Sequence, residues 1–432
     1  MNVNKIVAKL TEFDKQSFKE FDTYKIGRFF AVSYDELMHH YQSEKSYFRL
    51  FLKTIVRCFT QDYNYYFSDE VENMIVVFYS HEHARRPDYV NFMKDSVSLI
   101  DHYYLLTGND TRKRARCFGS AIKNLFLLPS WYRTICSVEE DKFNRMYLLS
   151  KISSAYRWKK YLDKNMKALG RIKGLVTIFD AREYENILTQ YVMQKGIKTA
   201  TLQHGYFPVI SNERGYLAIP YTGFVSDEFW AWGEYSCENA VMSGMLPQSC
   251  RAVGYPKTFK RIVDKTPKRD LMGIILDGGE NLLPYNEAIL TIAVEVAKKN
   301  NLKVVLKPHP HDKFDYTNMM GDFDNYEFSH ESIFDYGRKV DFSLCYASSA
   351  YIDLMAMGAS VFRYRKETSE NSYSRLNDKD TFTNASELDN LIQMSDNHIS
   401  DENRKALLGD LNNIKKQYNE AAQKLFYNNS DV

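Results

Sequence analysis

The feature that most constrains this chain is an alternation of short apolar strands and amphipathic helices that begins near residue 174. LVTIFD at 175–180 has the pattern of a buried strand, 182–196 has that of a helix, and 198–205 is again a strand. Two parallel strands need a crossover connection, and a helix of this length provides one. The alternation therefore predicts a parallel sheet with right-handed crossovers.

The same alternation restarts after a short polar segment, TPKRD at 266–270, which divides the chain into two halves. In the second half, strands are expected at 271–279, 302–310, 341–347 and 360–365, and helices at 286–300 and 349–358. Outside these two runs, the pattern predicts strands at 74–81 and 101–106 and a closing amphipathic helix at 403–427.

These patterns predict an α/β fold of the GT-B kind, with two Rossmann-like domains whose parallel sheets face a central cleft. We expect a first domain over 1–265 with helical additions at its start, a second domain over 266–400, and a closing C-terminal helix within 401–432. Open parallel sheets bind ligands at the carboxyl ends of their strands, so the candidate residues are those just past the strands.

Composition excludes several other classes of protein. The chain has 57 basic and 55 acidic residues, a net charge of +2, so it is no polycation and no nucleic acid is expected as a partner. Its six cysteines form no CxxC pair, which predicts free thiols in a reducing compartment. Neither a secretory signal nor an apolar run of about 18 residues is found, which favours a cytoplasmic protein.

His204 is the first candidate for catalysis, because it follows a buried strand in TLQHG and precedes Gly205. A neutral imidazole at such a strand end can accept a proton from an attacking hydroxyl group. The alternative is a structural histidine that bonds a nearby carbonyl group. Asp180, at the end of the preceding strand, is a reserve candidate for the catalytic base or for orienting His204.

His309 follows another strand, in LKPHPHD, and lies between Pro308 and Pro310. Proline fixes φ and keeps the residue before it extended, so Lys307, His309 and His311 are expected to point the same way. A lysine and two imidazoles directed at one place suit a pyrophosphate or another departing anion. A metal site with His309, His311 and Asp312 as ligands is the alternative, although the sequence shows no other ligands for it.

Ser348 and Ser349 open a predicted helix, where backbone N–H groups and the helix dipole favour an anion. We expect one serine to cap the helix, and contact of the other with a ligand stays open. Asp353, in the first turns of that helix, is expected to order the loop or to bond a ribose.

A last candidate segment follows the first strand of the second half. It comprises Asp277, Gly278, Gly279 and Glu280. A glycine pair lets backbone amides approach a phosphate closely, but the segment is neither a GxGxxG motif nor a P-loop. A turn without a ligand is an equally good interpretation.

Residues 111–173 contain two strongly basic stretches, 111–134 and 157–173, with aromatic and leucine side chains between the cations. Such a mixture is typical of helices that lie on anionic membranes, so peripheral contact with a membrane is one expectation. Single-stranded nucleic acid and an ordinary solvated helix face are the alternatives.

Together these elements resemble GT-B-fold bacterial glycosyltransferases and, more narrowly, the CDP-glycerol glycerophosphotransferase family of surface-polymer synthesis. The matching motifs are Gln203-His204-Gly205, His309-Pro310, and Ser348-Ser349 with Asp353 downstream. The resemblance covers 174–365. It implies that His204 activates the acceptor, that His309 meets the phosphate or leaving group of the donor, and that the serines bind phosphate.

This resemblance implies a metal-independent glycosyltransferase without a cofactor, which moves a sugar from a nucleotide-activated donor to a glycan or lipid-linked acceptor in capsular or surface-polysaccharide synthesis. A CDP-polyol phosphotransferase, a nucleotide-sugar epimerase and a non-catalytic scaffold that binds glycans are the alternatives. The expected location is the cytoplasm, or the inner face of the cell membrane if the basic region binds lipid.

Overall fold

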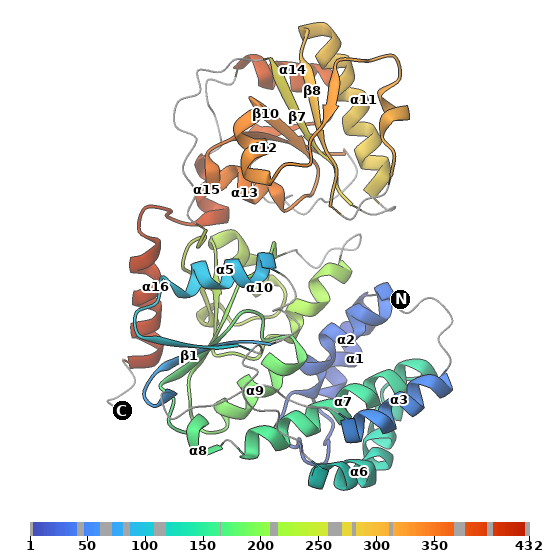
Figure 1. Ribbon diagram of the computed structural model, residues 1–432, viewed down its shortest axis with the longest axis vertical. Coiled ribbons are helices and arrows are strands. Elements are labelled where there is room, and N and C mark those ends of the chain that lie inside the picture. Colours follow the sequence, from blue (N-terminus) through green and yellow to red (C-terminus); the bar gives the residue numbers. More distant parts are fainter. Residues whose placement is uncertain are drawn as a thin grey trace. The chain divides into compact units, whose positions relative to one another are not determined.

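The computed structural model describes residues 3–40, 47–60, 71–80, 87–107, 118–164, 166–207, 215–257, 270–278, 282–310, 314–366, 376–394 and 401–427. The chain forms two compact units, one of Met1–Lys257 with Asn412–Val432 and the other of Thr258–Leu411. Each unit contains a sheet of six parallel strands (Figure 1). The predicted α/β fold with two Rossmann-like parallel-sheet domains is therefore confirmed. Except for Asp270, the expected linker at 266–270 lies outside the described residues.

The sheet of the first unit has the strand order β2-β1-β3-β4-β5-β6. Its strands are β1 (Ile75–Tyr79), β2 (Tyr103–Thr107), β3 (Gly174–Thr177), β4 (Thr199–Leu202), β5 (Glu228–Ala231) and β6 (Cys250–Ala252). Every residue of β1, β3 and β4 is buried, as expected of parallel strands covered on both faces. The first four strands agree with the pattern in the sequence, whereas β5 and β6 were not predicted.

Helices make up the rest of the first unit, and those before β1 form a layer of their own with α6 and α7 (Figure 1). The elements are α1 (Val3–Phe13), α2 (Ile26–His40), α3 (Tyr47–Thr60), α5 (Pro87–Val97), α6 (Phe118–Cys136), α7 (Lys142–Lys164), α8 (Met166–Leu169), α9 (Glu183–Met193), η2 (Gly215–Gly223), α10 (Glu234–Met242) and η3 (Pro247–Ser249). Many of the chain's rings form the core of this layer. The rings of Phe13 and Phe30, for example, meet edge to face at 5.2 Å.

Helices α1 and α2 pack unusually closely at Gly27. A Cβ atom on this residue would lie 1.8 Å from the carbonyl oxygen of Leu10, so only glycine fits there. At the same place, Asp14 Oδ1 accepts hydrogen bonds from the backbone N–H groups of Gly27 (2.6 Å) and Arg28 (3.2 Å). The carboxylate therefore satisfies free donors at the start of α2 and fixes the position of Arg28.

The second sheet has the strand order β12-β11-β10-β7-β8-β9. Its strands are β7 (Leu271–Ile275), β8 (Lys303–Lys307), β9 (Tyr326–Phe328), β10 (Phe342–Cys345), β11 (Ser360–Tyr364) and β12 (Thr381–Phe382). Around it lie α11 (Leu283–Asn300), η5 (Thr317–Met320), α12 (Ile333–Lys339), α13 (Ala350–Met357), η6 (Asp378–Asp380), α14 (Ala385–Met394) and α15 (Asp401–Leu408). The chain starts at β7, builds outward through β8 and β9, and then returns to add β10 on the other side. The strand order therefore reverses between β7 and β10.

The C-terminal segment closes the fold on the first unit, but the continuous helix predicted at 403–427 is wrong. Helix α15 ends before Gly409, whose φ of 68° is the left-handed conformation that ends many helices. A new helix, α16 (Ile414–Ala422), follows and continues into a π-helical turn, η7 (Gln423–Tyr427). The rings of Tyr418 and Phe426 lie 6.1 and 6.0 Å from Trp230 of β5, so this segment covers the first sheet.

Candidate functional site

The crevice where the strand order of the second sheet reverses is the first place to look for a ligand, since open parallel sheets bind ligands there. Asp277 follows β7 on one side of this point, and Ala347 follows β10 on the other. Asp277 Oδ2 accepts a hydrogen bond of 3.0 Å from the backbone N–H of Ala347. Asn286 bonds both backbone groups of Asp277, donating to its carbonyl at 2.8 Å and accepting from its N–H at 3.0 Å. This carboxylate therefore braces the two loops.

Gly278 and His309 meet at the neighbouring strand ends of β7 and β8. A Cβ atom on Gly278 would lie 2.7 Å from both Cγ and Nδ1 of His309. A Cβ atom essentially never lies this close to another heavy atom, so glycine is needed for the imidazole to lie here. The contact with His309 thus explains why the predicted segment 277–280 has a glycine at position 278.

The serine pair begins α13, next to Asp277 and Ala347. Ser348 Oγ accepts a hydrogen bond of 3.3 Å from the backbone N–H of Ala350, so this serine caps the helix. Ser349 is exposed and makes no capping bond with its side chain. Asp353 lies in the first turn of α13 and is half-buried. The structure brings the serine loop and Gly278 to the same edge of the second sheet.

Lys307 makes contacts within the second unit itself. Its Nζ donates a hydrogen bond of 2.5 Å to the carbonyl oxygen of Glu331 and lies 5.6 Å from the ring centre of Tyr336. Partial burial lowers the pKa of this lysine. Neither of these two contacts involves His309, and the convergence of the two side chains on one ligand stays a prediction. His311, Gly279 and Glu280 lie outside the described residues.

On the first sheet, His204 follows β4 and is held by the residue before it. Gln203 accepts a hydrogen bond of 2.8 Å from the N–H of Trp232 and donates one of 2.8 Å to the carbonyl of Gly205. The imidazole of His204 packs against Phe179 at 4.2 Å between ring centres and lies nearly parallel to Tyr221 at 6.1 Å. The predicted base is thus placed by a clamped loop and by two rings.

Asp180 is fully buried, and its contacts differ from those expected. Its Oδ2 accepts hydrogen bonds from the N–H of Val225 (3.1 Å) and from the N–H (2.6 Å) and hydroxyl (2.5 Å) of Ser226. These bonds hold the loop before β5 and lower the pKa of the carboxyl, but burial outweighs them and raises it to about 6. No hydrogen bond joins Asp180 to His204 among the described residues, so a role in orienting that histidine is not supported.

The raised pKa of Asp180 leads to a testable pH dependence. The native state favours the protonated form, so the stability linked to this group is fully present below about pH 4 and is lost as the pH rises through 6. We expect the wild type to lose up to about 3 kcal/mol relative to Asp180→Asn between pH 4 and pH 7. Urea unfolding of both proteins at the two pH values measures this. An unchanged difference in unfolding free energy would contradict the assignment.

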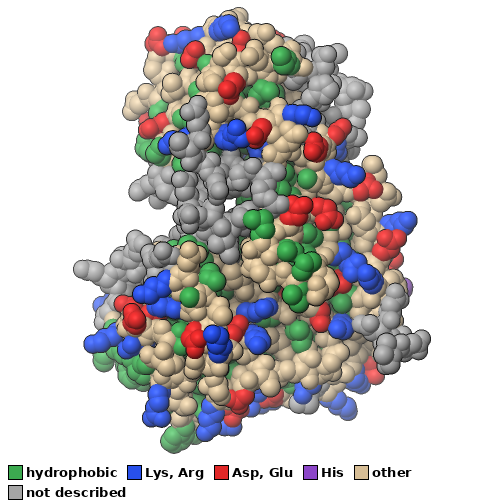
Figure 2. Space-filling model, turned by 180° about the vertical axis from the view of Figure 1, so that it is seen from behind, with side chains coloured by type: hydrophobic (Ala, Val, Ile, Leu, Met, Phe, Trp, Pro, Cys, Tyr) green, Lys and Arg blue, Asp and Glu red, His purple; other side chains and the backbone are tan. Residues whose placement is uncertain are grey.

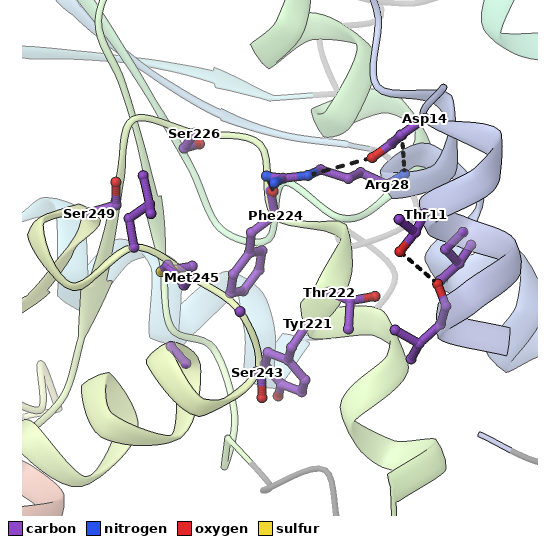
Figure 3. A pocket seen from close by; sticks show the side chains of 15 residues that line it. Thr11, Asp14, Arg28, Tyr221, Thr222, Phe224, Ser226, Ser243, Met245 and Ser249 are labelled. Carbon is purple, nitrogen blue, oxygen red and sulfur yellow. Dashed lines mark hydrogen bonds and ion pairs between the residues drawn. The ribbon is translucent and has the colours of Figure 1, made fainter. Parts of the chain in front are cut away.

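A pocket of about 460 Å³ lies within the first unit, and Tyr221, whose ring also stacks on His204, is one of its lining residues (Figure 3). Helices α1 and α2, η2, the loop before β5 and α10 contribute to it. Tyr221 and Phe224 supply aromatic surface, and Arg28 and Asp14 form its charged part. Arg28 donates a hydrogen bond of 2.5 Å to the carbonyl of Phe224, and its Nε lies 3.9 Å from Asp14 Oδ2. Burial raises the pKa of Asp14.

Sequence reasoning missed this pocket. Its charged residues lie in the N-terminal helices, where no motif was recognised. Arg28 and Phe224 are 196 positions apart, so nothing local links them. Tyr221 falls in a segment without clear periodicity. Tyr221 lies 17 positions after His204. Nothing in the sequence links the two residues, so their ring contact could not be predicted.

Two arginines near the same sheet edge, Arg363 on β11 and Arg365 just after it, form ion pairs within the protein. Arg363 is buried and forms a bidentate ion pair with Asp380, with a shortest distance of 2.6 Å. Arg365 pairs with Asp378 at 2.5 Å. Among the described residues there is also no group of three or more histidine, cysteine or acidic side chains arranged to hold a metal ion.

No family model matches this chain, and no curated protein matches it. Among solved structures, it is similar to MnaA of S. aureus in a co-structure with UDP, at 10% identity and a TM-score of 0.49, covering 82% of this chain and 97% of that one. The UDP-GlcNAc 2-epimerase of Neisseria meningitidis bound to UDP-GlcNAc is 11% identical, with a TM-score of 0.47 and coverage of 81% and 100%. TarM is 10% identical, with a TM-score of 0.40 and coverage of 62% and 55%. Similarity at this level concerns the fold and identifies no substrate.

Proposed function

We propose that this chain is a glycosyltransferase that moves a sugar from a nucleotide-activated donor to a hydroxyl group of a glycan or lipid-linked glycan in surface-polysaccharide synthesis. The observation that carries the proposal is the edge of the second sheet where the strand order reverses. There His309, after β8, packs against Gly278, after β7, and the Ser348-Ser349 loop follows β10 on the other side of β7. A helix N-terminus and an imidazole at one sheet edge suit the phosphates of a nucleotide.

In this proposal, the donor-side groups stabilise the departing nucleotide. The bond between the anomeric carbon and the phosphate oxygen breaks, and negative charge develops on that oxygen. His309, Ser349 and the backbone N–H groups at the start of α13 would meet this charge, which is the kind of electrostatic stabilisation that lowers a barrier most. Asp277 would not touch the donor. Its bond to Ala347 would keep the serine loop in place.

The acceptor-side groups lie on the first unit. His204 would take the proton from the acceptor hydroxyl, whose oxygen attacks the anomeric carbon as the phosphate leaves. The pocket that Tyr221 lines combines two aromatic rings with hydroxyl and charged groups, a mixture that suits a sugar of the acceptor. Tyr221 belongs both to the pocket and to the ring stack with His204, so a sugar bound there would lie close to the base.

A screen of nucleotides by thermal shift tests the proposal. A nucleotide present at about 100 times its Kd should stabilise the native state by about 2.7 kcal/mol and raise the unfolding midpoint by several degrees. A response to UDP compounds would support hexosyl transfer, and one to CMP compounds would support transfer of a sialic-acid-like sugar. Selective response to CDP compounds would favour polyol-phosphate transfer instead. No response to any of them would overturn the proposal in favour of a non-catalytic scaffold.

A further inference from the structure

Helix α3 exposes an apolar face to solvent, which is unusual for a helix of a folded protein. Its exposed apolar side chains are those of Phe48, Phe51, Leu52, Val56 and Phe59, with exposed fractions between 38% and 63%. We call this set the α3 face. The α3 face contains a large share of the exposed large hydrophobic side chains in the described part of the chain.

The α3 face is not the side by which the helix is attached to the protein. The attached side carries Thr54 and Cys58, both buried, and Cys58 Sγ lies 3.2 Å from Ser153 Oγ of α7. In an α-helix, positions 48, 51, 52 and 59 share one side with 56 at its edge, whereas 58 lies at the opposite edge, next to 51, and 54 lies beyond it. The helix is thus apolar on two sides, one packed against α7 and the other in solvent.

Cations border the α3 face on its remaining side. Arg49 and Lys53 are exposed and lie one turn apart, and Arg57 follows at the same spacing in the sequence YFRLFLKTIVRCFT. The helix contains no acidic residue. Figure 2 shows, over the whole of one face of the molecule, hydrophobic side chains that reach the surface among lysines and arginines. An exposed apolar face beside a row of cations matches the headgroup region of an anionic bilayer.

A second copy of this chain fits the α3 face less well. A two-fold contact would bring the α3 helices of both copies together, and the cations of each helix would find no acidic residue on the other. Without a carboxylate on the helix, α3 itself offers nothing to neutralise them. An anionic lipid surface supplies that charge directly.

The basic helix α7 does not offer a comparable surface. Its rings at Trp158 and Tyr161 are buried, and the Trp158 indole donates a hydrogen bond of 2.9 Å to the carbonyl of Tyr184. Lys160 pairs with Asp163 at 2.9 Å and with Glu20 at 3.4 Å. Aromatic and basic residues of α7 thus belong to the core and to ion pairs. Arg112, Lys113, Arg114 and Arg116 lie outside the described residues.

We propose that α3 binds the surface of an anionic phospholipid bilayer, with the α3 face at the boundary between headgroups and acyl chains and with Arg49 and Lys53 on lipid phosphates. No helix among the described residues is long and apolar enough to span a membrane. The attachment is therefore assigned to the interface alone. It does not depend on the proposed glycosyl transfer, since neither His204 nor His309 takes part.

Co-sedimentation with vesicles tests this proposal on the full chain. The protein should pellet with vesicles of phosphatidylglycerol and phosphatidylcholine, and much less with phosphatidylcholine alone. The double variant Phe48→Glu/Leu52→Glu should bind the anionic vesicles at least about tenfold more weakly, because it places two carboxylates at the interface. Arg49→Gln/Lys53→Gln should also weaken binding, about 30-fold, since each cation near an anionic surface contributes about 1 kcal/mol. Met394→Glu in α14, at a side chain that is 76% exposed, is the matched control and should bind like the wild type.

Fluorescence quenching tests the same contact even if the variant Phe48→Glu/Leu52→Glu does not fold. Phe48→Trp introduces an indole on the α3 face, whereas the native tryptophans of the chain at 131, 158, 230 and 232 are all buried. Vesicles with brominated acyl chains should quench the added emission. Absence of quenching, equal binding by Phe48→Glu/Leu52→Glu, or binding of the wild type to neutral and anionic vesicles alike would each overturn the proposal. Self-association that Phe48→Glu/Leu52→Glu abolishes, without vesicle binding by the wild type, would show an interface between copies instead.

Discussion

Replacing His204 by alanine is expected to lower the rate of sugar transfer about 10²–10⁴-fold, the usual contribution of a general base. The imidazole follows β4 and packs against the rings of Phe179 and Tyr221, and Tyr221 also lines the pocket proposed for the acceptor. Nucleotide binding should persist, because the donor groups belong to the second unit. Transfer is measured by release of the nucleotide that the thermal-shift screen identifies, with and without acceptor.

A second substitution separates catalysis from packing at His204. His204→Phe keeps a ring against Phe179, which is 4.2 Å away in the native protein, but it cannot accept a proton. If the histidine were only structural, His204→Phe would retain most of the activity and His204→Ala would lose stability. If it is the base, both variants should be inactive while the phenylalanine variant keeps the unfolding temperature of the wild type. Near-normal turnover of His204→Phe would exclude His204 as the base.

Much of the fold could be predicted because buried parallel strands are nearly continuous runs of apolar residues. The clearest runs, such as 75–79 and 271–275, became β1 and β7. The strands β6 and β9, with only three residues each, are too short and too exposed for a periodic signal. The break at Gly409 was missed for another reason. An isolated glycine within a helical pattern is tolerated in many helices, and only its φ of 68° shows that it ends one here.

For the candidate site, the sequence predicted which residues lie at the sheet edges, but not which groups they contact. Residues just past the strands were expected at the sheet edges, and His204, Gly278, His309 and the serine loop are found there. Their partners could not be foreseen. Asp277 bonds a backbone amide 70 positions away, and Lys307 bonds a carbonyl 24 positions away. Both side chains form hydrogen bonds with the protein's own backbone. These bonds depend on tertiary contacts, which a single sequence does not reveal.

His309 is expected to be the second residue whose loss nearly abolishes transfer. His309→Ala should lower the rate about 10²–10³-fold, the usual effect of removing one group that stabilises developing negative charge. The thermal shift caused by the nucleotide should also decrease, whereas it should persist in His204→Ala. A variant that retains both turnover and nucleotide response would show that His309 only packs against Gly278.

The contact between Gly278 and His309 permits a sharper version of this test. A methyl group at Gly278 would lie 2.7 Å from the imidazole, so Gly278→Ala should displace the ring and lower both activity and stability, the latter by about 1–3 kcal/mol. In the double variant Gly278→Ala/His309→Ala the ring is absent, and most of the lost stability should return while the activity stays low.

Gly205→Ala is the matched control for stability, because its nearest neighbour, Tyr221 Oη, would lie 3.7 Å from the added atom. Additive losses of stability in the double variant would contradict the close packing, and a return of activity would contradict the role of His309 in transfer.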